Sequence, residues 1–467
     1  MYKKNKHIHF MGIGGIGMSG IAQVLKQQGY KVSGCDTSEN TNILEYLKLI
    51  GCPIYNEHNE KHILDADVLV YSSAINQKNP EIQAAIKKGV PVIPRAIMLA
   101  ELMRMKHGIA IAGAHGKTTT TSIISHILIE AQLDPTVIIG GVLKNISAHA
   151  KLGTGSLLIA EADESDRSLL YLNPSIAVVT TIDAEHLDTY KDIEDIKETF
   201  KNFLARLPFY GKAFVCIDDP NIRSILPLTH IKVVKYGLNN DADIMGNIIE
   251  LNKTNSIFNV YEKVKSEATK HGHTYKLLGT ITLNMPGEHN VLNALASIAL
   301  SRDLEISFKI VQNALKSFKG IERRFEFKGA YKGADIFDDY GHHPTEIQKT
   351  LLVAQKRVQK KLHVIFQPHR FTRTEKLWND FVDTFSYSSI DTLYITDIYP
   401  ASEKPIEGIT SKKLANHIQN KNTKLKVLYF KTYDEITQHV KSHIQKGDLL
   451  ITLGAGKVNA IGESLVE

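Results

Sequence analysis

Apolar and polar positions in the first hundred residues switch between the period of a strand and that of a helix. "HIHFMG" (7–12) predicts a strand, "MSGIAQVLKQQ" (18–28) predicts a helix that Gly29 ends, and "KVSGCD" (31–36) predicts the next strand. Further strands are expected at "DVLVYSS" (67–73) and "VPVIP" (90–94), with a helix at "PEIQAAIKK" (80–88) between them. This order is typical of a doubly wound parallel sheet.

The alternation restarts twice farther along the chain. From residue 107, "HGIAIAGAHGKTTTTSIISHILIEA" predicts strand, glycine loop and helix, and later strands are expected at 136–141, 156–163, 175–183, 212–218 and 231–237. Residues 243–285 predict antiparallel strands, and helices are expected at 290–304 and 308–318. After residue 322 strands are expected at 361–368, 391–400, 426–430 and 448–456, with helices at 374–385 and 432–444.

These restarts predict an α/β protein of three domains. The expected bounds are 1–106 for an N-terminal Rossmann-like domain, 107–321 for a central P-loop domain and 322–467 for a C-terminal Rossmann-like domain. A chain of 467 residues is also longer than one hydrophobic core usually sustains.

Composition excludes several classes of protein. Hydrophobic residues make up 43% and charged residues 23%, and the net charge of +6 gives no concentrated arm for binding nucleic acid. No apolar run approaches the roughly 18 residues of a membrane span, and the basic N-terminus has no apolar core of a signal peptide. The cysteines, Cys35, Cys52 and Cys216, are widely spaced, which favours a reducing compartment. We therefore expect a cytoplasmic protein with no membrane insertion.

The most informative stretch is "AGAHGKTTTT" (112–121), which lies between an expected strand and helix. Glycine turns point backbone N–H groups at phosphate oxygens, Lys117 adds a charge for the terminal phosphates, and Thr118 offers a hydroxyl to Mg²⁺. Gly113 and Gly116 are separated by two residues, where the usual P-loop has four. The stretch predicts a short nucleotide phosphate loop, the alternative being a glycine turn with an incidental lysine.

An acidic partner for a metal is expected at the end of a neighbouring strand. "SLLIAEADESD" (156–166) ends an apolar run in four acidic residues, of which Glu161 is the first choice as a Mg²⁺ ligand. "VVTTIDAEHLD" (178–188) places Asp183, Glu185 and His186 at another strand end. A solvated acidic turn is the alternative for the first stretch, and His186 alone is weak evidence in a chain with 20 histidines.

The N-terminal loop fits the dinucleotide rule as well as another use. Gly12, Gly14 and Gly17 stand in G-x-G-x-x-G order, and Asp36 ends the next expected strand. Such a loop holds any diphosphate at a helix N-terminus, and the acidic residue can bind any ribose hydroxyl. Because the chain carries its own ATP loop, we expect the diphosphate of UDP here rather than NAD.

The sequence closely resembles the Mur ligase family. The resemblance rests on "MGIGGIGMSG" and "VYSSAI" in the first domain, on "GAHGKTTTT", "EADESD", "IDAEHLDTY" and "MPGEHNVLNALA" in the second, and on "GIERRFE", "DDYGHHPTEI" and "FQPHRFTRT" after it. It implies an ATP-dependent ligase of peptidoglycan precursor synthesis that joins L-alanine to the lactyl carboxylate of UDP-N-acetylmuramate. The implied route is an acyl phosphate, then a tetrahedral intermediate, with ADP and phosphate as products.

The resemblance also implies a division of labour among residues. Lys117, Glu161, His186, His342 and His343 are the expected catalytic residues, and Thr118, Glu161 and His186 the expected metal ligands. ATP is expected at Gly113, Ala114, His115, Gly116, Lys117, Thr118, Thr119, His289, Asn290, Asn293, Arg323, Arg324 and Asp338. The UDP-sugar is expected at Gly14, Gly15, Ile16, Gly17, Asp36, Ser72 and Ser73, and the amino acid and domain closure at Tyr340, His369, Arg370 and Arg373.

Several of these residues have a plainer interpretation. Asn290 could cap a helix, Arg323 and Arg324 could be a surface charge pair, and the pair His342–His343 could be a zinc fragment, although no third ligand stands at a recognisable spacing. The family's terminal "GAGD" turn reads "GAGK" here, with Lys457 in place of the acid.

Two other functions remain open at this point. One is a recycling ligase that adds a tripeptide to the same UDP-sugar, against which "FQPHR" favours a free amino acid. The other is a non-catalytic nucleotide sensor built from Rossmann-like domains, against which "GKTTTT" followed by "EADESD" counts. The expected cofactors are ATP and Mg²⁺, the expected partners are the small-molecule substrates and no nucleic acid, and the chain is expected to be a monomer or homodimer.

Overall fold

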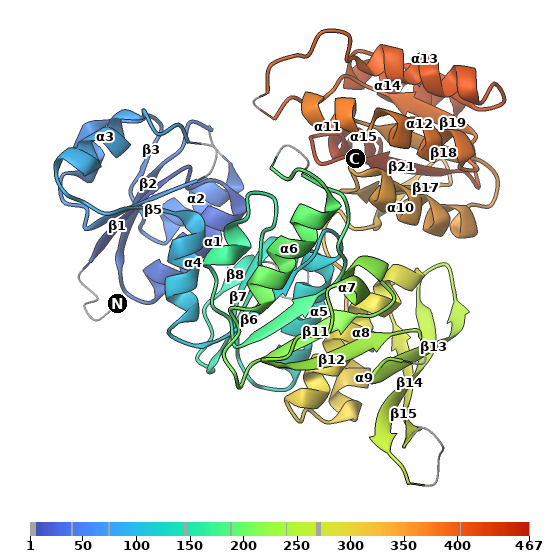
Figure 1. Cartoon of the computed structure of the whole chain (residues 1–467). Helices are drawn as coiled ribbons and strands as arrows, with labels where there is room; N and C mark the ends of the chain where they lie inside the picture. The colour runs from blue at the N-terminus through green and yellow to red at the C-terminus, as the bar shows by residue number, and fades with distance from the viewer. Residues whose placement is uncertain are drawn as a thin grey trace.

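The computed structural model describes residues 6–38, 41–72, 75–143, 148–186, 189–239, 241–267, 272–401 and 403–466. Within these residues the strands form three sheets, and Figure 1 shows them as three α/β bodies in chain order. The N-terminal and C-terminal bodies lie on different sides of the central one (Figure 1). The predicted three-domain α/β fold is thereby confirmed.

The first sheet is parallel throughout, in the order β3-β2-β1-β4-β5. Its order reverses at β1, which creates the crevice at the carboxyl ends of β1 and β4 where such sheets bind ligands. The elements are β1 (His7–Met11), α1 (Ile16–Gln27), β2 (Lys31–Cys35), α2 (Asn42–Leu49), β3 (Ile54–Tyr55), η1 (Glu60–Ile63), β4 (Val68–Tyr71), α3 (Pro80–Lys87), β5 (Val92–Pro94) and α4 (Arg95–Met103).

The second sheet has the order β15-β14-β13-β12-β11-β10-β6-β9-β7-β8 in the described residues. Its parallel part carries the phosphate loop after β6, and β13 to β15 are antiparallel, as the turn-punctuated pattern predicted. The elements are β6 (His107–Ala112), α5 (Lys117–Glu130), β7 (Thr136–Leu143), β8 (Ala148–Lys151), β9 (Leu157–Glu161), η2 (Ser168–Tyr171), β10 (Ile176–Val179), α6 (Ile193–Leu204), β11 (Lys212–Cys216), α7 (Pro220–Ser224), β12 (Lys232–Gly237), β13 (Ile244–Leu251), β14 (Ser256–Lys265), β15 (His273–Leu283), α8 (Glu288–Asp303) and α9 (Phe308–Ser317).

The third sheet runs β16-β17-β21-β18-β19-β20, parallel except for β16 at its edge. One predicted helix, 374–385, is divided at Leu377, whose φ of −103° and ψ of 21° leave the helical region. The elements are β16 (Glu326–Tyr331), β17 (Ala334–Asp339), α10 (Pro344–Arg357), β18 (Leu362–Phe366), α11 (Phe371–Lys376), α12 (Trp378–Tyr387), β19 (Thr392–Ile395), α13 (Ser411–Lys421), β20 (Lys426–Tyr429), α14 (Tyr433–His443), β21 (Leu449–Leu453) and α15 (Asn459–Val466).

The two junctions of the central sheet differ in character. Helix α1 packs on β7 and β8, and one continuous cluster of buried apolar residues runs from the first domain into the second. Gly20 allows this close approach, because a Cβ there would lie 3.3 Å from Cβ of Ala150. The C-terminal sheet has separate apolar clusters on its two faces. It meets the central domain largely through the polar side chains described below.

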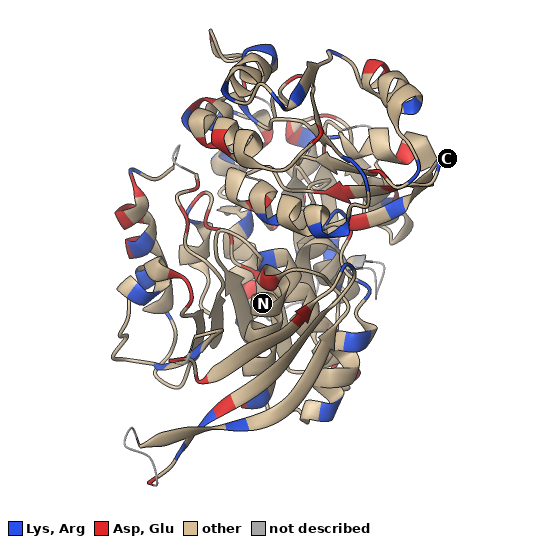
Figure 2. Ribbon diagram, turned by 90° about the vertical axis from the view of Figure 1, so that its right-hand side faces the viewer, with Lys and Arg blue, Asp and Glu red and all other residues tan. Residues whose placement is uncertain are grey.

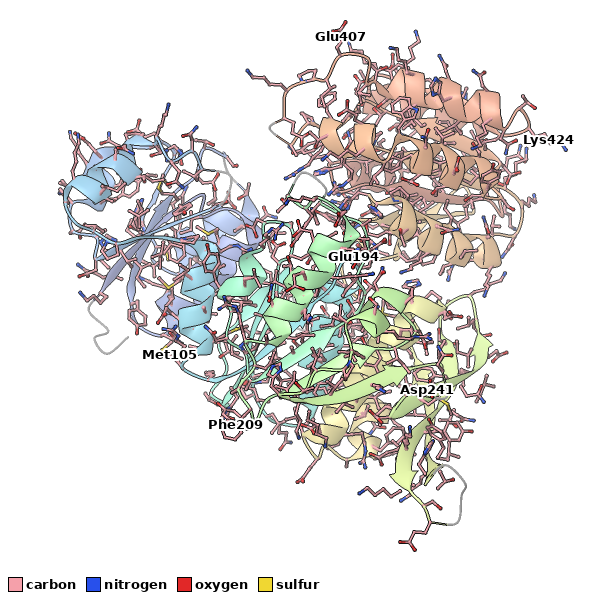
Figure 3. The ribbon with its side chains drawn as sticks, in the orientation of Figure 1. Met105, Glu194, Phe209, Asp241, Glu407 and Lys424 are labelled. Carbon is pink, nitrogen blue, oxygen red and sulfur yellow. The ribbon has the colours of Figure 1, made fainter. Side chains whose placement is uncertain are left out.

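The chain passes from the first sheet to the second just after Met105, which is half-exposed in the turn that follows α4 (Figure 3). Strand β6 of the second sheet begins at His107, and β16 of the third begins at Glu326. On this ground we propose the domain bounds 1–106, 107–321 and 322–467.

Figure 2 shows Lys and Arg positions mixed with Asp and Glu positions along the ribbon, in keeping with the modest net charge of +6. Among the described residues, none of the helices combines the length and the apolar character that crossing a bilayer requires.

Candidate active site

The loop between β1 and α1 is held in place by Asp36. One oxygen of this carboxylate accepts the N–H of Gly14 at 2.8 Å, and the other accepts the N–H of Ser38 at 2.9 Å. A Cβ on Gly14 would lie 2.8 Å from the same carboxylate, so the loop needs glycine there. Helix α1 then begins at Ile16 after Gly15, which has no side chain with which to cap it, and its first N–H groups face the crevice end of the sheet.

The other residues predicted for the UDP-sugar lie around this loop. Ser72 follows β4 and adjoins Gly12, at which a Cβ would lie 3.2 Å from that of the serine. Ser73 lies outside the described residues. Arg95, which the sequence analysis missed, approaches Gly17, where a Cβ would lie 3.0 Å from Nη1. Its position directly after strand β5, at the carboxyl edge of a parallel sheet, is the signal that could have identified it.

Arg95 also connects the first two domains. Its Nη2 lies 3.2 Å from Oδ2 of Asp163, which belongs to the acidic stretch after β9. Arg95 thereby links the glycine loop of the first domain to the acidic residues that follow β9 in the central sheet.

The phosphate loop spans Gly113 to Gly116, between β6 and α5. Gly113 has φ of 139° and Gly116 has φ of 81°, both in the region that favours glycine. A Cβ on Gly113 would meet Oγ1 of Thr180 at 2.1 Å. The N–H groups of Ala114 and His115 bond to Thr181, so two threonines after β10 fix the loop. Neither threonine was predicted as a site residue.

Lys117 is the first residue of α5 and reaches back over the loop. Its Nζ donates to the carbonyl of Gly113 at 2.6 Å, to that of Ala114 at 3.3 Å and to Oε1 of Glu164 at 2.8 Å. Burial works to lower the pKa of Lys117, and the Glu164 carboxylate outweighs it and raises that pKa above its ordinary value. The ammonium group is therefore a fixed positive charge at the mouth of the loop.

The predicted pair of Thr118 and Glu161 comes together at the end of β9. Oγ1 of Thr118 donates to Oε2 of Glu161 at 3.2 Å, and the N–H of Gly140 donates to Oε1 at 2.8 Å. Burial raises the pKa of Glu161 although Lys117 is near. Among the described residues no ion pair joins this carboxylate, whose two oxygens accept only the bonds from Thr118 and Gly140, which is a suitable environment for a divalent cation.

His186 belongs to a different set of polar atoms. Its Nε2 lies 3.6 Å from Oε1 of Glu164 and 3.8 Å from Oε2 of Glu185. These three residues have possible ligand atoms within 4.8 Å of one another. The structure thus separates the predicted metal ligands into two groups, Thr118 with Glu161 and His186 with two glutamates, and Glu164 is shared with Lys117.

A pocket lies between the central and C-terminal domains, beside the phosphate loop. Seven residues predicted for ATP line it: His115, Gly116, Thr119, His289, Asn290, Asn293 and Arg324. The rest of the lining was not predicted from the sequence and consists of Thr180, Thr181, Tyr236, Met285, Pro286, Leu292, Phe325, Asp339, Glu346, Lys349, Thr350 and Val353. Asn290 donates to the carbonyl of Pro286 at 2.7 Å, and Asn293 lies against Gly116. Apolar and hydrogen-bonding groups together suit a purine base and its ribose.

Arg323 and Asp338 are outside this lining. They pair with each other at 2.9 Å, and the guanidinium of Arg323 also donates to the carbonyls of Gly454 and Gly456. The turn that carries Lys457 in place of an acid thus binds Arg323 with backbone carbonyl groups and not with a side-chain carboxylate. The residues that line the pocket are instead Arg324 and Asp339, each of which directly follows the predicted residue in the sequence.

A second, smaller pocket opens beside His186. It is lined by Ala184, Glu185, His186, His343, Arg370, Thr372, Arg373, Lys376 and Leu377, from the central and C-terminal domains. Nδ1 of His343 lies 3.7 Å from Oε1 of Glu185 across the junction. Four of the predicted residues, His186, His343, Arg370 and Arg373, therefore meet in one cavity.

The remaining predicted residues contact side chains that line the two pockets or lie next to such residues. His369 stacks on Tyr399 at 5.4 Å between ring centroids, and its Nδ1 lies 3.2 Å from Nη1 of Arg373. Tyr340 lies under the guanidinium of Arg324, 5.4 Å from the ring centroid. Nδ1 of His342 lies 3.0 Å from the carbonyl oxygen of Tyr340.

The histidines of the junction differ in charge at neutral pH. Burial lowers the pKa of His342 to about 3, and it lowers the pKa of His343 and of His369 to about 4, so these rings are neutral at pH 7. For His115, burial acts in the same direction, and hydrogen bonding to Asp183 and Glu346 outweighs it and raises the pKa to about 9. The junction therefore contains neutral rings that can accept a proton and one imidazolium held between carboxylates.

Sequence models of three Mur ligase domains match the chain in order. They are the Mur ligase family catalytic domain at residues 7–107, the Mur ligase middle domain at 111–301 and the Mur ligase glutamate ligase domain at 323–456. The chain belongs to the Mur ligase family. Its three sheets correspond to the three matched Mur ligase segments.

Individual Mur ligases resemble the chain over its full length. It is 49% identical over 467 residues to the UDP-N-acetylmuramate–L-alanine ligase of Geotalea uraniireducens, covering 100% of this chain and 99% of that protein. A crystal structure of a UDP-N-acetylmuramate–alanine ligase from Thermotoga maritima has a TM-score of 0.79 at 25% identity, covering 98% of each chain. A murein peptide ligase from Psychrobacter arcticus has a TM-score of 0.71 at 24% identity, covering 99% of this chain and 98% of that one, and shows the same fold.

Proposed function

We propose that this protein is an ATP-dependent ligase that joins L-alanine to the lactyl carboxylate of UDP-N-acetylmuramate, releasing ADP and phosphate. The observation that carries the proposal is the position of Lys117, a fixed cation over a short phosphate loop, in a chain similar from end to end to ligases of this name. The product is an early precursor of peptidoglycan, made from small cytoplasmic substrates.

The chemistry requires activation because a carboxylate is a poor acyl donor. The lactyl carboxylate oxygen attacks the γ-phosphorus of ATP, the bond from that phosphorus to the ADP oxygen breaks, and an acyl phosphate forms. The amine of alanine then attacks the carbonyl carbon, and the tetrahedral intermediate collapses with loss of phosphate and of the amine proton. Positioning and neutralisation of charge supply most of the rate enhancement in phosphoryl transfer.

The phosphates of ATP would lie over the loop from Gly113 to Gly116, where backbone N–H groups and the N-terminus of α5 favour anions. The ammonium group of Lys117 would leave the Glu164 carboxylate and bind the terminal phosphate, so that one anionic partner is exchanged for another. The base and ribose would occupy the pocket with Asn290, Asn293 and Arg324.

The residues present fit Mg²⁺. Thr118 and Glu161 offer a hydroxyl and a carboxylate, the oxygen ligands that Mg²⁺ prefers, and burial, which raises the pKa of Glu161, disfavours its charged form in a way that a cation would offset. His186 with Glu164 and Glu185 offers a second group of donors. When bound, Mg²⁺ neutralises charge on the phosphate oxygens.

The UDP-sugar and the amino acid would approach from opposite domains. The diphosphate of UDP would lie at the N-terminus of α1, on the loop that Asp36 holds. Alanine would enter the smaller pocket, where Arg370 and Arg373 suit its carboxylate and the neutral ring of His343 can accept the amine proton.

A phosphate-release assay tests this function. The purified chain is incubated with Mg-ATP and UDP-N-acetylmuramate, and L-alanine, glycine, L-serine or the tripeptide of the recycling ligases is then added. We expect phosphate and one new amide with L-alanine. Product with the tripeptide alone would identify a recycling ligase, absence of turnover with every amine would favour a nucleotide sensor, and phosphate release without any amine would contradict the coupled mechanism.

A further inference from the structure

A buried group of metal-binding side chains lies in the N-terminal domain, apart from both pockets. His9 on β1, Cys35 at the end of β2 and Glu81 in the first turn of α3 have possible ligand atoms within 4.8 Å of one another. Side chains of His9 and Glu81 are 0% exposed, and so is Cys35. A buried carboxylate is costly unless a charge or several hydrogen bonds compensate for it. None of these three side chains has a role in the function proposed above.

The three donor atoms converge on one point. Nε2 of His9 and Sγ of Cys35 each lie 3.3 Å from Oε2 of Glu81. Nε2 of His9 makes no hydrogen bond within the described part of the chain, although it is fully buried and faces this oxygen. Nδ1 of His58 lies beside this group, 3.1 Å from Sγ of Cys35 and 3.9 Å from Oε1 of Glu81, and is the nearest candidate for a fourth ligand.

The surrounding residues hold these donors in a ligating orientation. Nδ1 of His9 is bound to Oγ of Ser33 at 2.7 Å, so Nε2 is the nitrogen left to face the group. Oε1 of Glu81 accepts the N–H of Asn59 at 2.9 Å and lies 2.8 Å from Nδ1 of His62, so Oε2 is the oxygen left to face it. Metal-binding histidines and carboxylates in proteins have this kind of outer support.

The separations match a tetrahedral zinc site. Bonds of about 2.0–2.1 Å to nitrogen and oxygen and about 2.3 Å to sulfur place neighbouring ligands about 3.3–3.6 Å apart. Nε2 of His9 and Sγ of Cys35 each lie at such a distance from Oε2 of Glu81, 3.3 Å, and Sγ of Cys35 is slightly closer, 3.1 Å, to Nδ1 of His58. We propose that His9, Cys35, Glu81 and His58 form a structural zinc site that ties β1 and β2 to α3.

The chemistry of the donors favours zinc over Mg²⁺. A thiolate and two imidazoles are borderline to soft ligands that suit Zn²⁺, whereas Mg²⁺ prefers oxygen. The thiol of Cys35 donates a hydrogen bond to Glu81 in this structure. Metal binding would displace the thiol proton, which would be released to solvent. The resulting thiolate and carboxylate together balance the two charges of Zn²⁺. Cys35 directly precedes Asp36, so the ion would also stiffen the loop that Asp36 holds.

Cobalt substitution tests the proposal without reference to activity. The full-length chain, free of metal, nucleotide and affinity tag, is titrated with Co²⁺ and its absorption is recorded. We expect one equivalent to produce a thiolate-to-cobalt charge-transfer band with the strong visible bands of tetrahedral cobalt, and Zn²⁺ to remove both. The charge-transfer band separates this site from the His–Glu groups at the domain junction, which contain no cysteine.

Two kinds of variant complete the test. Cys35→Ser should abolish the charge-transfer band, while Cys52→Ser and Cys216→Ser, at the other two buried free thiols, should keep it. Glu81→Gln, which preserves shape, should weaken Co²⁺ binding by at least about tenfold. A wild-type chain without the band, a band that survives Cys35→Ser, or unchanged affinity in Glu81→Gln would each overturn the proposal. The wild-type spectrum decides the question even where a variant fails to fold.

Discussion

Nδ1 of His115 in the phosphate loop lies 3.5 Å from Oε1 of Glu346 in helix α10, so the ATP loop and the C-terminal domain face each other directly. On its other side, Nε2 of the same ring lies 2.9 Å from Oδ2 of Asp183, which also accepts the hydroxyl of Thr345 at 2.9 Å. A single histidine thus bridges one carboxylate from each domain. The residue predicted to contact the nucleotide phosphates thus also joins the two domains.

The charge of His115 should be measurable by NMR titration of the wild-type ring. Its pKa is raised from 6.5 to about 9, so its contribution to the stability of the junction is complete below about pH 6.5 and is lost as the pH rises through about 9. Asp183→Asn removes a hydrogen-bonded carboxylate and should lower the midpoint. A wild-type midpoint near 6.5 would show that the two carboxylates do not hold the proton.

Removing the ammonium group of Lys117 should abolish ligation. We expect Lys117→Ala to lower kcat by about a thousandfold or more, because a fixed charge near the transferred phosphoryl group stabilises the transition state. Phosphate release with UDP-N-acetylmuramate and L-alanine measures the effect. Lys424→Ala, at an exposed lysine of the C-terminal domain (Figure 3), is the control. Activity retained in Lys117→Ala would contradict the assigned role.

Asp36→Ala should act on the UDP-sugar alone. The variant loses the acceptor for the N–H of Gly14, and the KM for UDP-N-acetylmuramate should rise by about tenfold, since such charge-assisted bonds are worth about 1.5–3 kcal/mol. The KM for ATP should stay within about twofold, because ATP has its own loop. Steady-state kinetics with each substrate varied in turn separates the two, and Asp241→Ala, at an exposed position (Figure 3), is the control. A larger effect on ATP than on the UDP-sugar would refute the assignment.

Arg373→Ala should weaken binding of the amino acid. Arg373 lines the smaller pocket, and loss of its guanidinium should raise the KM for L-alanine by about tenfold or more, as for other charged hydrogen bonds. Binding of ATP, measured by calorimetry in the absence of alanine, should be unchanged. Arg104→Ala, at an exposed arginine of the first domain, is the control. An unchanged KM for alanine would place the amino acid elsewhere.

The sequence predicted those parts of the site that depend on local pattern. The strand, glycine loop and helix around Lys117 follow from their order along the chain. The pairing of Thr118 with Glu161 follows because the carboxyl ends of parallel strands meet at one edge of the sheet. The fold class followed from the same alternation.

Local pattern could not predict which face of a strand a given side chain points to, nor which residues contact each other between domains. Successive residues of β17 point to opposite faces, which sends Asp338 to Arg323 and Asp339 to the pocket, and the pattern of apolar residues did not choose between them. Arg95 and Glu346 contribute through partners far away in the sequence, Asp163 and His115. Such contacts are set by how separately folded domains pack, and no local periodicity records that packing.

The two junctions of the central domain should respond differently to ionic strength. Dissolved salt screens the charges that join His115 of the central domain to Glu346 of the C-terminal domain, although less where the groups are buried. The contact of α1 with β7 and β8 is continuous with an apolar core, and salt does not weaken such a contact. Raising the salt concentration is therefore expected to loosen the junction with the C-terminal domain and to leave the junction with the N-terminal domain in place.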